Sequence, residues 1–238
     1  MLTLFFVDDL PTVVGTTYEF SGDDALHAIK VLRTQVGETF NLSDGRGTWS
    51  TVTALEVGKK SMMVRVVESG FQELLPVEFT VIQAVPKGDR IKESIEMCTE
   101  GGADRIIMWK SARSIGKVDE KIEKLQVTAR EASKQSRRFY IPAIDGVSST
   151  ADILSLIASS DLALVFHESA SEKISDLVAP GAKNVAIIIG PEGGLTDDEV
   201  AAFAAAGAKV ALMGRPILRS AHAGLAALSA VNTALTTW

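Results

Sequence analysis

The feature that most constrains the fold is a strand, a loop and a helix in direct succession in the last quarter of the chain. Residues 185–189 form an unbroken apolar run, as in a strand buried on both faces of a parallel sheet. A glycine-rich turn over residues 190–194 follows, and Thr196 then precedes a polar segment as a helix cap would. This succession predicts an α/β protein, a class in which ligands bind at the carboxyl ends of the strands.

The glycine-rich turn is the strongest candidate for a ligand site. Its glycines let backbone N–H and C=O groups approach a ligand closely. Its spacing is neither G-x-G-x-x-G nor G-x-x-x-x-G-K-[ST], so the dinucleotide-binding and P-loop fingerprints are absent. A second turn, residues 212–219, follows the next predicted strand, and Arg219 stands at the start of an uncharged helix. The two turns are expected to converge at one sheet edge around a ligand, although a tight turn and a surface arginine would give the same pattern.

The pattern of strands and helices changes at residues 70–76. Before this point, short alternating strands separated by glycine turns predict a small barrel, with one helix over residues 22–33 and Ser21 as its cap. After it, strands alternate with helices, which predicts a parallel sheet covered on both faces. The predicted domains are residues 1–72 and 73–238. Expected strands are 39–43, 49–55, 61–67, 77–85, 105–109, 163–166, 185–189 and 209–213; expected later helices are 88–101, 119–135, 197–206 and 221–237.

Composition excludes several classes of protein. With 46% hydrophobic and 23% charged residues among 238, the chain is globular rather than disordered. A single cysteine, Cys98, excludes an internal disulfide framework, and three scattered histidines make a metal site unexpected. Residues 1–11 lack the cationic start of a signal peptide, and residues 220–238 carry too many polar groups for a membrane span. A cytoplasmic protein is expected.

Positive charge is concentrated in one segment of an acidic chain. Residues 86–140 hold 13 Lys and Arg against 9 Asp and Glu, whereas the whole chain has a net charge of −6. Basic side chains at helical spacing suit phosphates, and neighbouring aromatic rings can stack on unpaired bases. A solvated helix face would show the same pattern. The segment's main cations are Lys87, Arg90, Arg113, Arg130, Lys134, Arg137 and Arg138, followed by Phe139 and Tyr140.

Together and in this order, the motifs resemble the RsmE family of 16S rRNA uridine-N3 methyltransferases, within the SPOUT superfamily of knotted methyltransferases. The resemblance covers essentially the whole chain. It rests on His27–Arg33 and Asp44–Gly47, on Lys87–Arg90, Thr99–Glu100 and Gly102–Ile106, on Arg113–Ser114 and Ala129–Ser136, and on the turns Ile189–Gly194 and Gly214–Arg219. Many members carry Glu-Thr where this chain has Ala221 and His222, and Arg215-Pro216 is swapped relative to the usual order.

The resemblance implies a fold, a cofactor and a substrate. The fold would be a SPOUT α/β domain with a C-terminal trefoil knot behind a small PUA-like, RNA-binding β-barrel. The cofactor would be S-adenosylmethionine (SAM), and the substrate N3 of a uridine in the decoding region of 16S rRNA, free or within the small subunit. A homodimer is expected. The implied cofactor residues are Gly190, Pro191, Glu192, Gly193, Gly194, Leu212, Met213, Gly214, Ile217 and Leu218; the implied RNA contacts are His27, Arg33, Lys87, Arg90, Arg113, Arg130, Lys134 and Arg138.

Three residues are candidates for the chemistry. Arg219 cannot accept a proton, since its guanidinium stays charged, so it would bind the uracil oxygens and stabilise the deprotonated ring. Glu192 would act as a base or orient the cofactor or substrate, and His222 would accept the proton or pack at the helix start. Three alternatives stay open: a SPOUT ribose 2′-O-methyltransferase, an inactive RNA-binding relative, and an enzyme that binds ATP or NAD at the glycine-rich turn.

Overall fold

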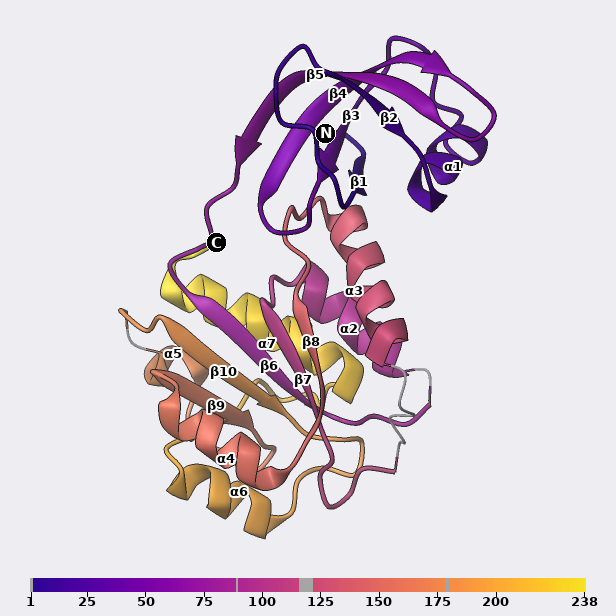
Figure 1. Cartoon of the computed structure of the whole chain (residues 1–238). Helices are drawn as coiled ribbons and strands as arrows, with labels where there is room; N and C mark the ends of the chain where they lie inside the picture. The colour runs from indigo at the N-terminus through magenta and orange to yellow at the C-terminus, as the bar shows by residue number, and fades with distance from the viewer. Residues whose placement is uncertain (1, 89, 116–121, 179) are drawn as a thin grey trace. The chain divides into compact units, whose positions relative to one another are not determined.

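The computed structural model describes residues 2–88, 90–115, 122–178 and 180–238 (Figure 1). Contacts between Cα atoms divide the chain into two compact units. The first comprises residues 1–74 together with 133–141, and the second comprises residues 75–132 and 142–238. Among the described residues, no helix is long and apolar enough to cross a membrane.

The first unit is built on one mixed, five-stranded sheet. Its strands are β1 (Leu4–Phe6), β2 (Thr17–Phe20), β3 (Thr39–Ser43), β4 (Thr48–Val57) and β5 (Met62–Phe71), in the order β1-β3-β4-β5-β2. The β1–β3 pair is parallel and the other pairs are antiparallel. No ladder in the described residues joins the edge strands β1 and β2, so the sheet is an open half-barrel rather than a closed barrel. Phe5, Phe20 and Phe40 fill its inner face, with ring centroids 5.4–5.6 Å apart.

Helix α1 (Asp23–Lys30) is shorter than the pattern predicts. Its N-cap is Gly22 and makes no side-chain capping hydrogen bond, so the predicted Ser21 cap is wrong. The acidic residues Asp23 and Asp24 in the first turn favour the helix start instead. The helix ends before Arg33 because that residue adopts a left-handed backbone with φ of 57°.

Residues 133–141 complete the first unit from a distant part of the sequence. Lys134 Nζ donates to Asp24 Oδ1 over 2.6 Å, and both side chains are nearly buried. Phe139 stacks on Trp49 with ring centroids 5.6 Å apart, and the Tyr140 hydroxyl donates to the carbonyl of Gln72 over 2.6 Å. The half-barrel therefore includes a segment that the sequence pattern assigns to the other domain.

The second unit is an all-parallel, six-stranded sheet covered by helices. Its strands are β6 (Glu78–Ala84), β7 (Arg105–Trp109), β8 (Ala143–Ser148), β9 (Leu162–Phe166), β10 (Asn184–Ile189) and β11 (Lys209–Ala211), in the order β11-β9-β10-β6-β7-β8. This confirms the predicted α/β architecture. The helices are α2 (Arg90–Glu100), α3 (Ile122–Ser136), α4 (Thr150–Ser159), α5 (Ile174–Leu177), α6 (Asp197–Ala205) and α7 (Ser220–Leu235).

Alternation along the strands sends successive side chains to opposite faces. Ile82 of β6 packs in a core with Ile153 of α4 and Phe203 of α6. The other face carries α2 and α7, which pack against each other (Figure 1). At Gly224 of α7 an added Cβ would lie 2.5 Å from Cys98 Sγ of α2. Burial raises the pKa of the Cys98 thiol to about 12, so this group stays protonated at neutral pH.

Five elements of the structure are absent from the sequence-based expectations: β1, β2, β8, α4 and α5. Strand β8 holds Asp145 and Gly146, which interrupt the apolar pattern expected of a parallel strand. Helix α4 begins with a capping box in which Ser149 and Asp152 bond each other's backbone, a signal that the sequence does contain. The predicted start of the 119–135 helix, at Asp119, lies outside the described residues.

Candidate functional site

Because all six strands of the second unit are parallel, their carboxyl ends meet at one edge of the sheet. The glycine-rich loop, residues 190–194, follows β10 at this edge. The N–H of Gly194 donates to the Pro191 carbonyl over 2.9 Å, and Gly194 adopts φ of +70°, a conformation that favours glycine. Thr196 and Glu199 then form the capping box that starts α6, as the sequence predicts for Thr196.

The strand order separates the two loops that the sequence singles out. β9 lies between β10 and β11, so the glycine-rich loop and the second loop, residues 212–219, do not leave adjacent strands. The segment after β9 runs beside the second loop instead. His167 N–H donates to the Ala211 carbonyl over 3.2 Å, and Leu212 N–H donates to the Glu172 carbonyl over 2.8 Å.

The segment after β9, residues 167–173, therefore also borders the carboxyl edge of the sheet beside the two loops. The sequence pattern did not predict that this segment contributes to the site. The segment brings His167 and the exposed Glu168 to the carboxyl end of β9. The predicted strand at 163–166 followed by a polar His-Glu pair is the signal that could have found it, because ligand sites lie where parallel strands end.

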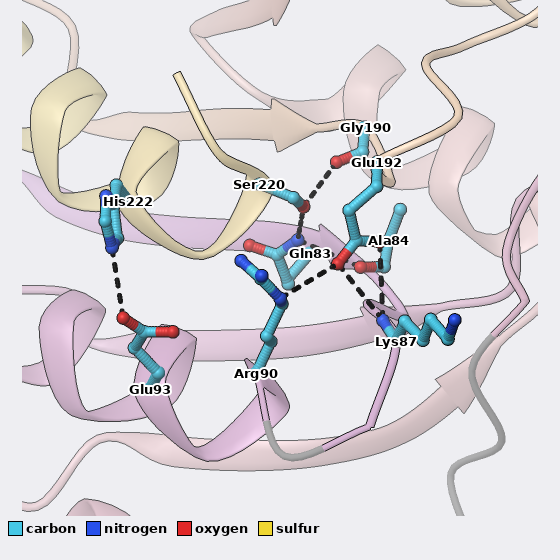
Figure 2. Close-up of polar contacts among 9 residues, drawn as sticks. All are labelled: Gln83, Ala84, Lys87, Arg90, Glu93, Gly190, Glu192, Ser220 and His222. Carbon is cyan, nitrogen blue, oxygen red and sulfur yellow. Dashed lines mark hydrogen bonds and ion pairs between the residues drawn. The ribbon is translucent and has the colours of Figure 1, made fainter.

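Glu192 joins the glycine-rich loop to the loop that follows β6. Its carboxylate accepts the Lys87 N–H at 3.2 Å and 3.3 Å from the two oxygens, and the Arg90 Nε lies 4.0 Å from Oε1. Figure 2 shows these contacts converging on the same carboxylate. Glu192 thus has a cationic and a backbone partner, both from residues predicted to contact RNA.

Arg113, after β7, also holds the glycine-rich loop. Its Nη1 donates to the Gly193 carbonyl over 3.1 Å and to the Leu195 carbonyl over 3.2 Å. An added Cβ on Gly193 would lie only 3.2 Å from Arg113 Cβ, so a side chain there would crowd the loop. The structure gives Arg113 a contact with the predicted cofactor loop, where the sequence suggests only a phosphate contact.

The second loop is exposed from Gly214 to Arg219. Ile217 is 79% exposed and Leu218 is 40% exposed, which leaves apolar side chains at the sheet edge. Arg219 is the N-cap of α7, and its side chain makes no capping hydrogen bond. In the first turn of α7, His222 Nε2 lies 3.0 Å from Glu93 Oε1 of α2, and both side chains are about 40% exposed (Figure 2).

The eight candidate RNA contacts divide between the two units. His27, Arg33, Lys134 and Arg138 belong to the first unit, whereas Lys87, Arg90, Arg113 and Arg130 belong to the second. His27 and Arg33 are exposed. Lys134 is nearly buried in its ion pair with Asp24, so an RNA contact by Lys134 would require that pair to open.

Two family descriptions match this chain. Residues 73–232 match the family described as an RNA methyltransferase domain, and residues 20–67 match the one described as an RNA methyltransferase PUA domain. The match over residues 73–232 therefore identifies the parallel sheet and its helices as an RNA methyltransferase domain of the α/β class.

Similar proteins narrow the class. Ribosomal RNA small subunit methyltransferase E of Mycobacterium bovis is 35% identical over 244 residues, covering 99% of this chain and 93% of that protein. Two solved structures share a TM-score of 0.87 and 25% identity, with 98% of both chains covered: a putative methyltransferase of Legionella pneumophila in complex with SAM, and ribosomal RNA small subunit methyltransferase E of Neisseria gonorrhoeae bound to SAM. The chain belongs to the RsmE family, which confirms the resemblance found in the sequence.

Proposed function

We propose that this enzyme transfers a methyl group from SAM to N3 of a uridine in 16S rRNA of the small ribosomal subunit. The observation that carries the proposal is the match to ribosomal RNA small subunit methyltransferase E over 99% of the chain. The N3 position follows from the family that the sequence motifs resemble. A substrate of this kind places the activity in the cytoplasm.

The carboxyl edge of the sheet has the chemistry that SAM requires. An adenine ring binds between apolar side chains, and Ile217 and Leu218 present such side chains at the edge. The glycine-rich loop and the second loop supply backbone groups that can approach the ligand closely. The proposed cofactor residues are Gly190, Pro191, Glu192, Gly193, Gly194, Leu212, Met213, Gly214, Ile217 and Leu218.

When bound, SAM supplies a methyl group on a positively charged sulfur. The N3–H of uracil must lose its proton, and the Watson–Crick edge must be exposed, so the base is unpaired or flipped out. The Arg219 guanidinium keeps its charge and stabilises the negative charge that spreads onto the uracil oxygens. As N3 takes the methyl group, the neutral thioether leaves, and the N3 proton passes to a protein acceptor.

His222 is the proposed proton acceptor. In the neutral ring, a hydrogen on Nε2 donated to the Glu93 carboxylate leaves the lone pair on Nδ1, where the proton can be accepted. Glu192 is assigned a positioning role instead, since its carboxylate is engaged by Lys87 and Arg90.

The finer parts of the fold belong to the same proposal. Residues 1–72 are proposed as a PUA-like RNA-binding domain and residues 73–238 as a SPOUT domain. A trefoil knot is supported by the path of the chain after β11, which runs beside residues 167–173 and returns as α7 against α2 and β10. A homodimer is supported by the uncharged length of α7.

Isothermal titration with SAM, with ATP and NAD as controls, tests the cofactor. Micromolar SAM binding without binding of the controls is expected, and binding of ATP or NAD in place of SAM would contradict the proposal. Methylation of unmodified small subunits, followed by mapping of the modified nucleotide, then tests the position. Ribose methylation would replace N3 by a 2′-O activity, and SAM binding without transfer would indicate an inactive relative.

Two of the arginines proposed to contact RNA, Arg130 in α3 and Arg138 just after it, are tested by salt dependence. The double variant Arg130→Glu and Arg138→Glu is expected to weaken RNA binding and to reduce the slope of log Kd against log salt by about 1.5, since two phosphate contacts are lost. The matched control is Lys59→Glu with Lys60→Glu, which changes the charge equally at the exposed turn after β4. Equal slopes for both double variants would show that Arg130 and Arg138 make no phosphate contact.

A further inference from the structure

A chain of buried hydrogen bonds ends on the first residue of the glycine-rich loop. Ser94 Oγ of α2 donates to Gln83 Oε1 of β6 over 2.8 Å. Gln83 Nε2 donates to Ser220 Oγ of α7 over 2.9 Å, and Ser220 Oγ donates to the Gly190 carbonyl over 2.6 Å. Figure 2 shows Gln83, Ser220 and Gly190 in this succession. Gln83 and Ser94 are fully buried and Ser220 is 6% exposed, so solvent does not compete for these bonds.

The Gln83 amide fixes which group donates and which accepts in this series of hydrogen bonds. Its Nε2 also donates to the Ala84 carbonyl over 2.9 Å, so both amide hydrogens are used. A flipped amide would set its oxygen against the Ala84 carbonyl, two acceptors without a hydrogen between them, which excludes the alternative orientation. Since Ser220 accepts from Gln83, its single hydroxyl hydrogen goes to Gly190.

The position of Ser220 gives this bond its importance. Ser220 is the first residue of α7 and follows Arg219 directly, whereas Gly190 is the first residue after β10. The bond therefore joins the backbone that carries the proposed charge-stabilising guanidinium to the loop that carries the proposed cofactor contacts. Arg219 has no side-chain capping bond of its own to fix the start of α7.

We propose that Ser220, oriented by Gln83, is a positioning residue for methyl transfer. The inference rests on the proposed function, and it assigns Ser220 no contact with substrate or cofactor. Its hydroxyl fixes the separation between Gly190 and the backbone of Arg219. Because a misplacement of about 1 Å can reduce a rate by about 10²-fold, loss of the hydroxyl lowers kcat. The KM for RNA changes little, since the phosphate contacts lie on other residues.

Two serine-to-alanine variants form a matched pair. Ser220→Ala removes the bond to the loop, whereas Ser94→Ala removes an equally buried hydroxyl at the far end of the same chain of bonds. Melting temperature, SAM affinity by titration, and kcat and KM on unmethylated small subunits are measured for each. Both variants are expected to melt slightly below the wild type. Only Ser220→Ala is expected to lose kcat, by about 10- to 100-fold, and Ser220→Thr, which keeps a hydroxyl, is expected to recover most of it.

The outcomes separate this inference from the function on which it rests. Equal kcat values for Ser220→Ala and Ser94→Ala overturn the positioning role while the wild type still binds SAM and methylates RNA. A wild type that binds no SAM overturns the proposed function and this role with it. If Ser220→Ala does not fold, Gln83→Met removes the group that orients Ser220, and an unchanged kcat in that variant refutes the proposal.

Discussion

A side chain at Gly224 is predicted to force α7 away from α2. In Gly224→Ala the new Cβ would lie 2.5 Å from Cys98 Sγ, about 1 Å inside an ordinary contact, and Cys98 is fully buried. Overpacking of this kind costs about 1–3 kcal/mol, and the better helix propensity of alanine returns about 1 kcal/mol. The expected net loss is about 0–2 kcal/mol, which lowers the melting temperature by up to about 8 °C.

A double-mutant cycle with Cys98→Ala tests the reasoning by urea unfolding. Cys98→Ala alone removes one buried sulfur and costs about 1 kcal/mol. In the double variant the methyl group added at position 224 occupies the space that the sulfur leaves, so the two costs are expected to fall short of their sum by at least about 1 kcal/mol. Additive costs in the cycle would refute the assigned contact.

Three further predictions address the glycine-rich loop, the acceptor of the N3 proton and the stability of the fold in acid. Gly193→Val is expected to abolish SAM binding in titration while the protein stays folded by circular dichroism, because the side chain would crowd Arg113; normal affinity would remove the loop from the cofactor site. His222→Gln is expected to lower kcat at least about 100-fold with SAM affinity unchanged, and an unaltered rate would exclude it as the acceptor. The backbone N–H groups of Lys183 and Asn184 donate to the Asp161 carboxylate and lower its pKa. The charged carboxylate therefore stabilises the fold above about pH 4, and this contribution is lost as the pH falls through the lowered pKa. The melting temperature of Asp161→Asn should therefore fall less than that of the wild type between about pH 5 and pH 3. Parallel curves of melting temperature against pH for the two proteins would contradict the stabilising role of the Asp161 carboxylate.

The sequence predicted the strands that are continuous and apolar. β10 and β7 lie within one residue of the predicted ranges 185–189 and 105–109, because every residue after the first in each strand is buried and apolar. β8 was missed because Gly146 and its neighbours break that pattern. An open sheet and a closed barrel have the same strand pattern, so the half-barrel could not be distinguished in advance.

The candidate site shows the same division between local and distant information. The glycine-rich loop and the Thr196 cap could be predicted because both are local signals. The insertion of β9 between β10 and β11 could not, since sheet order depends on contacts between distant residues. The ion pair of Lys134 with Asp24 spans 110 positions, and at helical spacing Lys134 looks like any solvent-facing cation.

The return of residues 133–141 to the half-barrel has a consequence for synthesis of the protein. A ribosome that has released only the first 74 residues has made every strand of the half-barrel, but not the ring that stacks on Trp49 or the cation that pairs with Asp24. The N-terminal unit therefore stays incomplete until residues 75–132 of the other unit have been synthesised. Folding of the two units during translation is interleaved, and a gene fragment cut after residue 72 would encode the sheet without the segment that finishes it.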